Sequence, residues 1–181
     1  MKNDTRLLAR SALLAALAAA LMYVSAVIPS GRAAVIAIAG LMSCAAVISC
    51  GTGWAWGVFA VTAVLSLLVL PLKGCAVIYA AFLGWYPIAK SLIERRIRSS
   101  AAQWAIKLVL FNAAMAALLI LAKWALLDGG FPENIHGWMI AAAYVVLNAV
   151  FFIYDVLMTR LIPVYIDRVA NKIFKQGGQR K

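Results

Sequence analysis

Five polar side chains interrupt the long apolar stretches of this sequence and are the first candidates for chemistry. They are Lys90, Lys107, Asn112, Asn148 and Asp155. A charge at the centre of a membrane-spanning helix costs about 2.5–3.5 kcal/mol on insertion scales, so such residues need partners or water. The functional interpretation is an ion or proton path built on Asp155. The structural alternative is a buried pair of Asp155 with Lys90 or Lys107 that holds helices together.

The positions of these residues along the predicted helices place three of them at a similar depth. Lys90, Lys107 and Asp155 all fall in the half of the membrane that we assign to the cytoplasmic side. A long Lys side chain can extend from there to the interface, and a single carboxylate is too few for a proton relay. Both points favour the structural alternative. Asn112 and Asn148 fall nearer the centre, where they can bridge two helices.

Catalytic and metal chemistry find little support in the sequence. Cys44, Cys50 and Cys75 lie in or at the ends of apolar runs and form no CxxC or Cys/His cluster. The single histidine, His136, is in a predicted loop, and the sequence has no acidic cluster and no Gly-rich phosphate loop. We therefore expect no enzymatic activity, no metal and no cofactor, and ATP hydrolysis would have to come from another protein.

The composition indicates which elements hold these side chains. Of 181 residues, 66% are hydrophobic and 13% are charged, whereas a soluble domain is about 45–50% apolar and about 25% charged. The surplus of apolar side chains must face lipid, which excludes a soluble enzyme, a disordered chain and a disulfide scaffold. We predict an all-α polytopic membrane protein whose residues 1–181 form one integral membrane domain.

Six apolar stretches are long enough to cross a bilayer, which takes about 20 residues. They cover residues 8–28, 33–50, 54–72, 74–93, 104–127 and 137–165, and a basic tail follows over 166–181. Strands of a barrel would be shorter and would alternate strictly, so the spans are predicted as a compact bundle of helices. The first run is longer than a signal-peptide core, which favours a retained helix. Pro87 is predicted to kink the fourth span.

Basic residues are concentrated on one side of this predicted topology. The net charge is +11, and Arg95, Arg96 and Arg98 fall on the same side as the basic N-terminus and tail. The opposite side receives only Arg32, Lys73 and Lys123 among basic residues. Because cytoplasmic loops carry the excess of Lys and Arg, both termini are predicted to be cytoplasmic. The charge indicates contact with anionic lipid rather than with nucleic acid.

The first span carries small residues at regular spacing. Ala12, Ala16 and Ala20 recur every four residues, and membrane helices approach closely where small side chains line one face. The row can serve internal packing or form a docking face for another membrane protein, and spacing alone does not choose between them.

With these features the chain resembles the substrate-binding S component of energy-coupling factor (ECF) vitamin transporters. The resemblance rests on the six-helix layout, the basic cytoplasmic N-terminus and the row Ala12, Ala16 and Ala20. It implies a bacterial plasma-membrane protein that captures a small solute from outside. It also implies that the alanine row docks on a transmembrane coupling subunit driven by two cytoplasmic ATPases.

The resemblance further implies a solute site between the outer halves of spans four to six. The candidates there are Arg32, Lys73, Tyr79, Trp124, His136, Trp138 and Tyr144. Aromatic rings would stack on a planar ligand and cations would meet a carboxylate or phosphate. Taken singly, Trp124 and Trp138 are more typical of an interfacial aromatic belt than of a ligand site. For Arg32 and Lys73, the alternative is a solvated charge in a loop. The alternative function is a membrane scaffold of a cell-shape or envelope complex, of the MreD type, with no solute.

Overall fold

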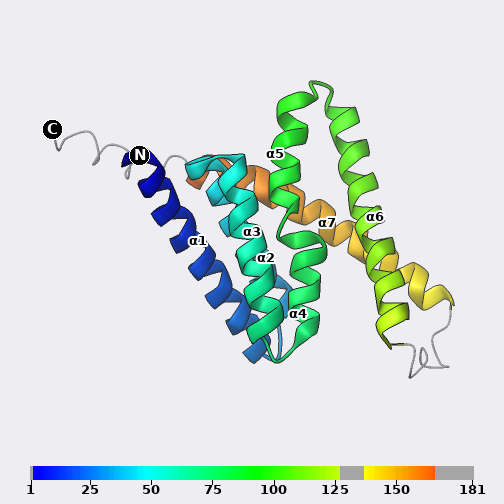
Figure 1. The fold of residues 1–181 in the computed structure, drawn as a ribbon. Helices are drawn as coiled ribbons and strands as arrows, with labels where there is room; N and C mark the ends of the chain where they lie inside the picture. Colours follow the sequence, from blue (N-terminus) through cyan, green and yellow to red (C-terminus); the bar gives the residue numbers. More distant parts are fainter. Residues whose placement is uncertain (1, 127–136, 166–181) are drawn as a thin grey trace.

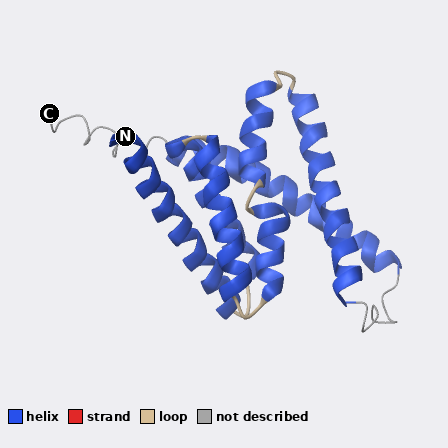
Figure 2. Ribbon diagram, in the orientation of Figure 1, coloured by secondary structure: helices blue, strands red, loops and turns tan. Residues whose placement is uncertain are grey.

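The computed structural model describes residues 2–126 and 137–165, and these residues are helical with short connections (Figures 1 and 2). No strand occurs in that part of the chain. The elements, in chain order, are α1 (Lys2–Val27), α2 (Arg32–Cys50), α3 (Thr52–Val69), α4 (Lys73–Ile78), the π-helical η1 (Tyr79–Leu83), α5 (Tyr86–Arg96), α6 (Ser100–Leu126) and α7 (Gly137–Tyr165). Taking α4, η1 and α5 as one span, six spans are long and apolar enough to cross a membrane.

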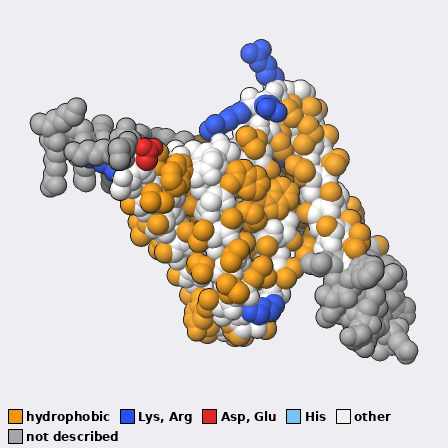
Figure 3. Space-filling model, viewed as in Figure 1, with side chains coloured by type: hydrophobic (Ala, Val, Ile, Leu, Met, Phe, Trp, Pro, Cys, Tyr) orange, Lys and Arg blue, Asp and Glu red, His pale blue; other side chains and the backbone are white. Residues whose placement is uncertain are grey.

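The face of the described helices drawn in Figure 3 is largely apolar, with Lys and Arg side chains near its ends. Large aliphatic side chains point away from the bundle, and Leu68, Val109 and Val145 are 72%, 67% and 67% exposed. A water-soluble protein seldom exposes contiguous apolar surface on this scale. The fold is therefore that of a candidate multi-pass membrane protein.

Tight turns join the first three helices into a bundle in which each helix contacts the other two. Gly51 connects α2 to α3 with φ +92°, and Gly31 precedes α2 with φ +79°, a region that residues with a Cβ rarely enter. The third span was predicted to reach residue 72, but α3 ends at Val69. The reason is Pro71, which disfavours helical backbone at the residue before it, and Leu70 is extended.

Small side chains allow α1, α2 and α3 to pack closely. Ala15, Ala46 and Ala55 are buried together in one core cluster, to which α5 contributes the fully buried Ile88. A second cluster, formed around Met22 and including Tyr79, lies between the other halves of these helices and α4. Close packing of this kind replaces the hydrophobic effect as the attraction between helices in lipid.

The fourth span was predicted as one helix over 74–93 with a kink at Pro87, and the structure divides it into α4, η1 and α5 with the break just before that proline. In η1 the Gly84 amide donates to the Tyr79 carbonyl, five residues back, at 2.8 Å. A turn follows, and Pro87 lies in the first turn of α5, where the missing N–H costs nothing. The break therefore precedes Pro87. Proline cannot donate to the Leu83 carbonyl, so a regular helix cannot continue through this point.

The last two helices are buried only over a short length. Among their described residues, α6 buries Lys107 and Phe111, and α7 buries Phe151, Asp155 and Met158. Figure 1 shows α7 crossing the bundle obliquely behind α5, with α6 at the side of α5. Their attachment to the other helices therefore depends on these few side chains.

Candidate functional site

Three charged side chains from three helices meet inside the bundle. With Glu94, they form a group of four that we call the ionic cluster. Lys90 of α5, Lys107 of α6 and Asp155 of α7 are 1%, 3% and 2% exposed. The structure thus joins Asp155 to both lysines that the sequence offered as alternatives. Buried charges of this kind persist only when they are paired and hydrogen-bonded.

Both carboxylate oxygens of Asp155 are occupied. Oδ1 accepts from the Lys90 ammonium and from the Tyr86 hydroxyl at 2.5 Å. Oδ2 accepts from the Lys107 ammonium at 3.2 Å. The carboxylate therefore bridges α5 and α6 from its position on α7.

The two ammonium groups have further partners. Lys90 Nζ donates to the Asp155 backbone carbonyl at 2.9 Å and to the Thr159 hydroxyl at 2.8 Å. Lys107 Nζ donates to Glu94 Oε1 at 2.7 Å, and Glu94 also lies 3.4 Å from Lys90 Nζ. Two positive and two negative charges balance, and three donors on each ammonium find several acceptors.

The ionic cluster is closed on one side by a layer of aromatic rings. One helical turn from each charged residue stands a ring: Tyr86 before Lys90, Phe111 after Lys107 and Phe151 before Asp155. The Phe111 and Phe151 rings stack at 4.5 Å between centroids, and the Tyr86 and Phe151 rings meet edge to face at 5.3 Å. On the other side Glu94 is 33% exposed. The ring layer and the pairing of all four charges favour a lock between helices over a path across the membrane.

The hydrogen bond from Tyr86 gives a first prediction. Tyr86→Phe removes the hydroxyl that bonds to Asp155 and leaves the ring packing unchanged. Because a hydrogen bond to a charged group contributes about 1.5–3 kcal/mol, the free energy of unfolding should fall by about that amount, measured by thermal unfolding in detergent. Tyr23→Phe is the matched control, since Tyr23 is 52% exposed. Equal unfolding of both variants would contradict the role of Tyr86.

Asn112 and Asn148 do not belong to the ionic cluster. Asn112 accepts a hydrogen bond from the Tyr144 hydroxyl and donates to the Leu108 carbonyl in its own helix. Asn148 donates to the Tyr144 carbonyl at 2.9 Å. The expectation that both asparagines bridge two helices is therefore met by Asn112 only, because Asn148 turns back to its own helix.

The predicted solute-binding residues that the structure describes lie in different surroundings and form no hydrogen bond with one another. Arg32 Nε donates to the Ile28 carbonyl, and Lys73 Nζ donates to the Leu67 carbonyl. Both cations therefore contact the backbone near the end of the preceding helix. Tyr79 is fully buried in the core, and Trp138 is 70% exposed. Tyr144 is exposed and bonds to Asn112 as described. The side chain of Trp124 and all of His136 lie outside the described residues.

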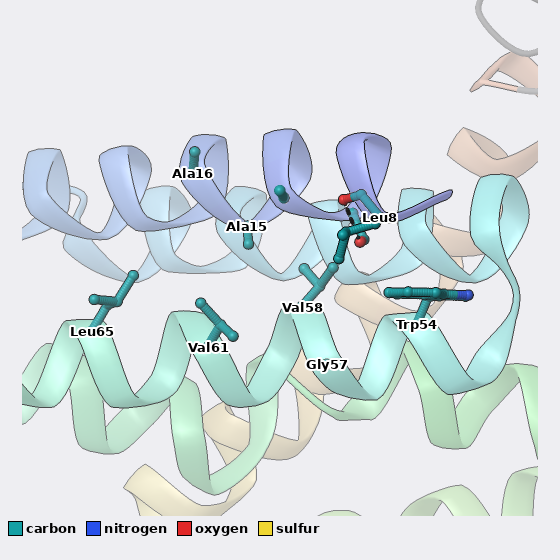
Figure 4. Close-up of a pocket in the computed structure, with 10 residues that line it drawn as sticks. Leu8, Ala15, Ala16, Trp54, Gly57, Val58, Val61 and Leu65 are labelled. Atoms are coloured by element: carbon teal, nitrogen blue, oxygen red, sulfur yellow. Dashed lines mark hydrogen bonds between the residues drawn. The ribbon is translucent and has the colours of Figure 1, made fainter. Parts of the chain in front are cut away.

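The alanine row of α1 lies at the surface of the bundle, with Ala12 and Ala16 beside α3. Ala12, Ala16 and Ala20 are exposed, whereas the adjacent Ser11 and Ala15 are buried, and Ala15 packs against α2 and α3. An apolar groove of about 340 Å³ runs between α1 and α3. Figure 4 shows Ala15 of α1 pointing at the row of α3 side chains across it. The groove is lined by Leu8, Ser11, Ala12, Ala15, Ala16, Trp54, Gly57, Val58, Val61 and Leu65.

Sequence reasoning missed three members of the site: Tyr86, Glu94 and Thr159. Their spacing was the available signal, because Tyr86, Lys90 and Glu94 succeed one another every four residues, as do Asp155 and Thr159. Side chains four apart lie on one face of a helix. Glu94 directly follows the predicted fourth span, 74–93, and adjoins the basic residues Arg95 and Arg96.

No protein-family model, no curated protein and no solved structure matches this chain. Its function therefore has to be argued from the ionic cluster, the groove and the surface. Among the described residues, no group of three or more His, Cys, Asp or Glu side chains could hold a metal ion.

Proposed function

We propose that the chain is the solute-capturing membrane subunit of an uptake transporter of the energy-coupling factor type, in a bacterial plasma membrane. It performs no chemistry of its own and binds no cofactor. Its partners are lipid, a small-molecule solute, a transmembrane coupling subunit and two cytoplasmic ATPases that supply the energy. The proposal joins the resemblance of the sequence to the surface that α1 presents.

The observation that carries the proposal is the exposure of the alanine row. The fold uses the adjacent row of α1 for internal packing and leaves Ala12 and Ala16 on the wall of a groove. Gly57 on the opposite wall adds no side chain. A partner helix can approach closely over such a surface, and dispersion contacts and backbone proximity then stabilise the pair.

The distribution of charge supports a cytoplasmic N-terminus. In Figure 1 the N-terminal end of α1 lies at the same end of the bundle as the connection between α5 and α6. The last turn of α5 carries Arg95 and Arg96 and the connection carries Arg98, and all three are exposed. This end would face the cytoplasm and its anionic lipids, and the solute would arrive at the opposite end.

A single bulky substitution tests the docking surface. Ala16→Trp should abolish co-purification of the coupling subunit and the ATPase pair in mild detergent, because the ring fills the groove that the partner helix needs. Leu17→Trp is the matched control: Leu17 is the next residue on α1, is 47% exposed and does not line the groove. Undiminished co-purification of the Ala16→Trp variant would refute the docking surface.

The solute is identified by native mass spectrometry of the purified protein. A small molecule retained by the unmodified chain and by Ala16→Trp alike would separate capture from docking. Retention of no solute by either protein, despite recovery of the transporter partners, would contradict the capture role.

A membrane scaffold of the cell envelope is the second candidate. The saturated ionic cluster favours it, since a scaffold requires fixed helices and no polar cavity, and the solute candidates that the structure describes are dispersed. Recovery of cell-wall machinery in place of ATPases in the same purification would establish this alternative.

A further inference from the structure

Three exposed arginines lie where α5 ends and the chain turns into α6. Arg95 and Arg96 belong to the last turn of α5, and Arg98 lies in the connection. We call these three residues the arginine patch, and Figure 3 shows basic side chains projecting at this end of the bundle. Gln103 Nε2 of α6 donates to the Ile97 carbonyl at 2.7 Å. The backbone that carries the patch is thus bonded to the first turn of α6.

The arginine patch has no ion-pair partner among the acidic side chains that the structure describes. Its neighbour Glu94 is engaged elsewhere, because Glu94 Oε1 accepts from Lys107 Nζ at 2.7 Å and lies 3.4 Å from Lys90 Nζ. Asp155 is engaged by the same two lysines. The ionic cluster therefore balances its own charges and leaves the three guanidinium groups without a counter-charge from residues 2–126 and 137–165.

The arginine patch begins one helical turn beyond an exposed apolar side chain. Leu92 of α5 is 41% exposed, and Arg96 follows four residues later on the same face. Helical rise puts about 6 Å between the two positions along the axis. On α6, Ile106 is 38% exposed. This change from apolar to basic surface corresponds to the level at which acyl chains give way to headgroups, which favours a lipid over an acidic protein as the partner.

The side-chain chemistry of the patch fits a phosphate. A guanidinium group is planar and donates in a fork that matches two phosphate oxygens, whereas an ammonium group acts as a point charge. All three positions of the patch carry this fork. A lipid with a net negative headgroup supplies the phosphate and the missing counter-charge together, and basic segments beside a membrane attract such lipids.

We propose that the arginine patch binds the phosphate of an anionic phospholipid headgroup, and that the bound lipid stabilises the paired ends of α5 and α6. These ends hold Lys90, Glu94 and Lys107 of the ionic cluster. The proposal is independent of the transport function. It also distinguishes the patch from two exposed cations elsewhere, since Arg32 and Lys73 already bond to backbone carbonyls.

The thermal midpoint of the full chain in detergent, followed by tryptophan fluorescence, tests the proposal. Phosphatidylglycerol at about ten times its Kd should raise the midpoint by about 3–5 °C more than the same amount of phosphatidylcholine does. The combined variant Arg95→Gln, Arg96→Gln and Arg98→Gln should lose this difference. An equal rise in this variant would place the headgroup elsewhere and overturn the proposal.

A charge-matched control separates a site from general attraction. Arg6→Gln, Arg32→Gln and Lys73→Gln together also remove three exposed positive charges, and this variant should keep the full rise. If it loses the rise as well, only the overall charge matters and the patch is not a site. Inorganic phosphate that raises the midpoint as much as the lipid would replace the headgroup with free phosphate. No rise with phosphatidylglycerol, together with a protein that the patch variant alone fails to retain, would replace the lipid with an acidic protein surface.

Discussion

Asp155→Ala is expected to lower the free energy of unfolding by about 3–5 kcal/mol, the loss found when one partner of a buried ion pair is removed. The ionic cluster holds two ammonium groups and two carboxylates, and Asp155 contacts both ammonium groups. Without it, Glu94 is the one carboxylate of the ionic cluster left to Lys90 and Lys107, and a net positive charge remains buried. Thermal unfolding of the purified protein in detergent, followed by tryptophan fluorescence, measures the loss.

Two companion variants show that charge balance causes the effect. Asp155→Asn combined with Lys90→Met removes one charge of each sign, so it should be more stable than Asp155→Asn alone. Glu94→Gln should cost less than Asp155→Asn, because Glu94 is 33% exposed and water screens its charge.

The same variants separate a lock from an ion path. A lock predicts that Asp155→Asn lowers protein level and stability together. If stability is unchanged and a transport activity is lost, the carboxylate acts on an ion instead. If protein level, stability and transport are all unchanged, both interpretations of Asp155 fail.

The helical architecture could be predicted from the sequence because it depends on length and polarity alone. Six apolar runs, separated by Gly, Pro and charged residues, correspond to six spans in the structure. A turn residue such as Gly51 can be recognised in the sequence, because the backbone at this turn has a positive φ, which glycine adopts readily. These signals are local, and they do not depend on which helices become neighbours.

The ionic cluster could be predicted only in part. Depth along a helix placed Lys90, Lys107 and Asp155 at one level, and this follows from helical rise. Depth does not say which residues at the end of a helix turn inward, so Glu94 was missed. Nor does it reveal that Tyr86 reaches the carboxylate, since that depends on the rotation of α5 about its axis.

The solute candidates show a further limit of sequence reasoning. Arg32 and Lys73 were chosen for their charge and predicted side of the membrane, but each is bound to backbone carbonyls at a helix end. Tyr79 was chosen as an aromatic residue near the outer side, yet it is fully buried. Residue type and depth give a set of possible contacts, and only the packing decides which of them form.

Gly40→Ala is the second substitution expected to have a large effect, because α2 contacts the break in span four at this residue. A Cβ on Gly40 would lie less than 3.0 Å from the Leu83 carbonyl oxygen and 3.0 Å from the Tyr154 hydroxyl. The carbonyl belongs to the backbone that Pro87 leaves without a donor, so it cannot move aside as a flexible side chain would. Overpacking of this kind costs about 1–3 kcal/mol, and the thermal midpoint should fall accordingly.

Gly57→Ala is the matched control for Gly40→Ala. It makes the same chemical change, and its expected effect on stability has the opposite sign. Gly57 lies within α3, and a Cβ there meets nothing within 4 Å. Alanine has the higher helix propensity, so this variant should gain about 0.4–1 kcal/mol. The sequence presents both residues as glycines in apolar runs, and only the approach of Leu83 distinguishes them. If Gly40→Ala is as stable as Gly57→Ala, α2 does not contact the π-turn closely, and the packing that positions α7 against α2 must be different.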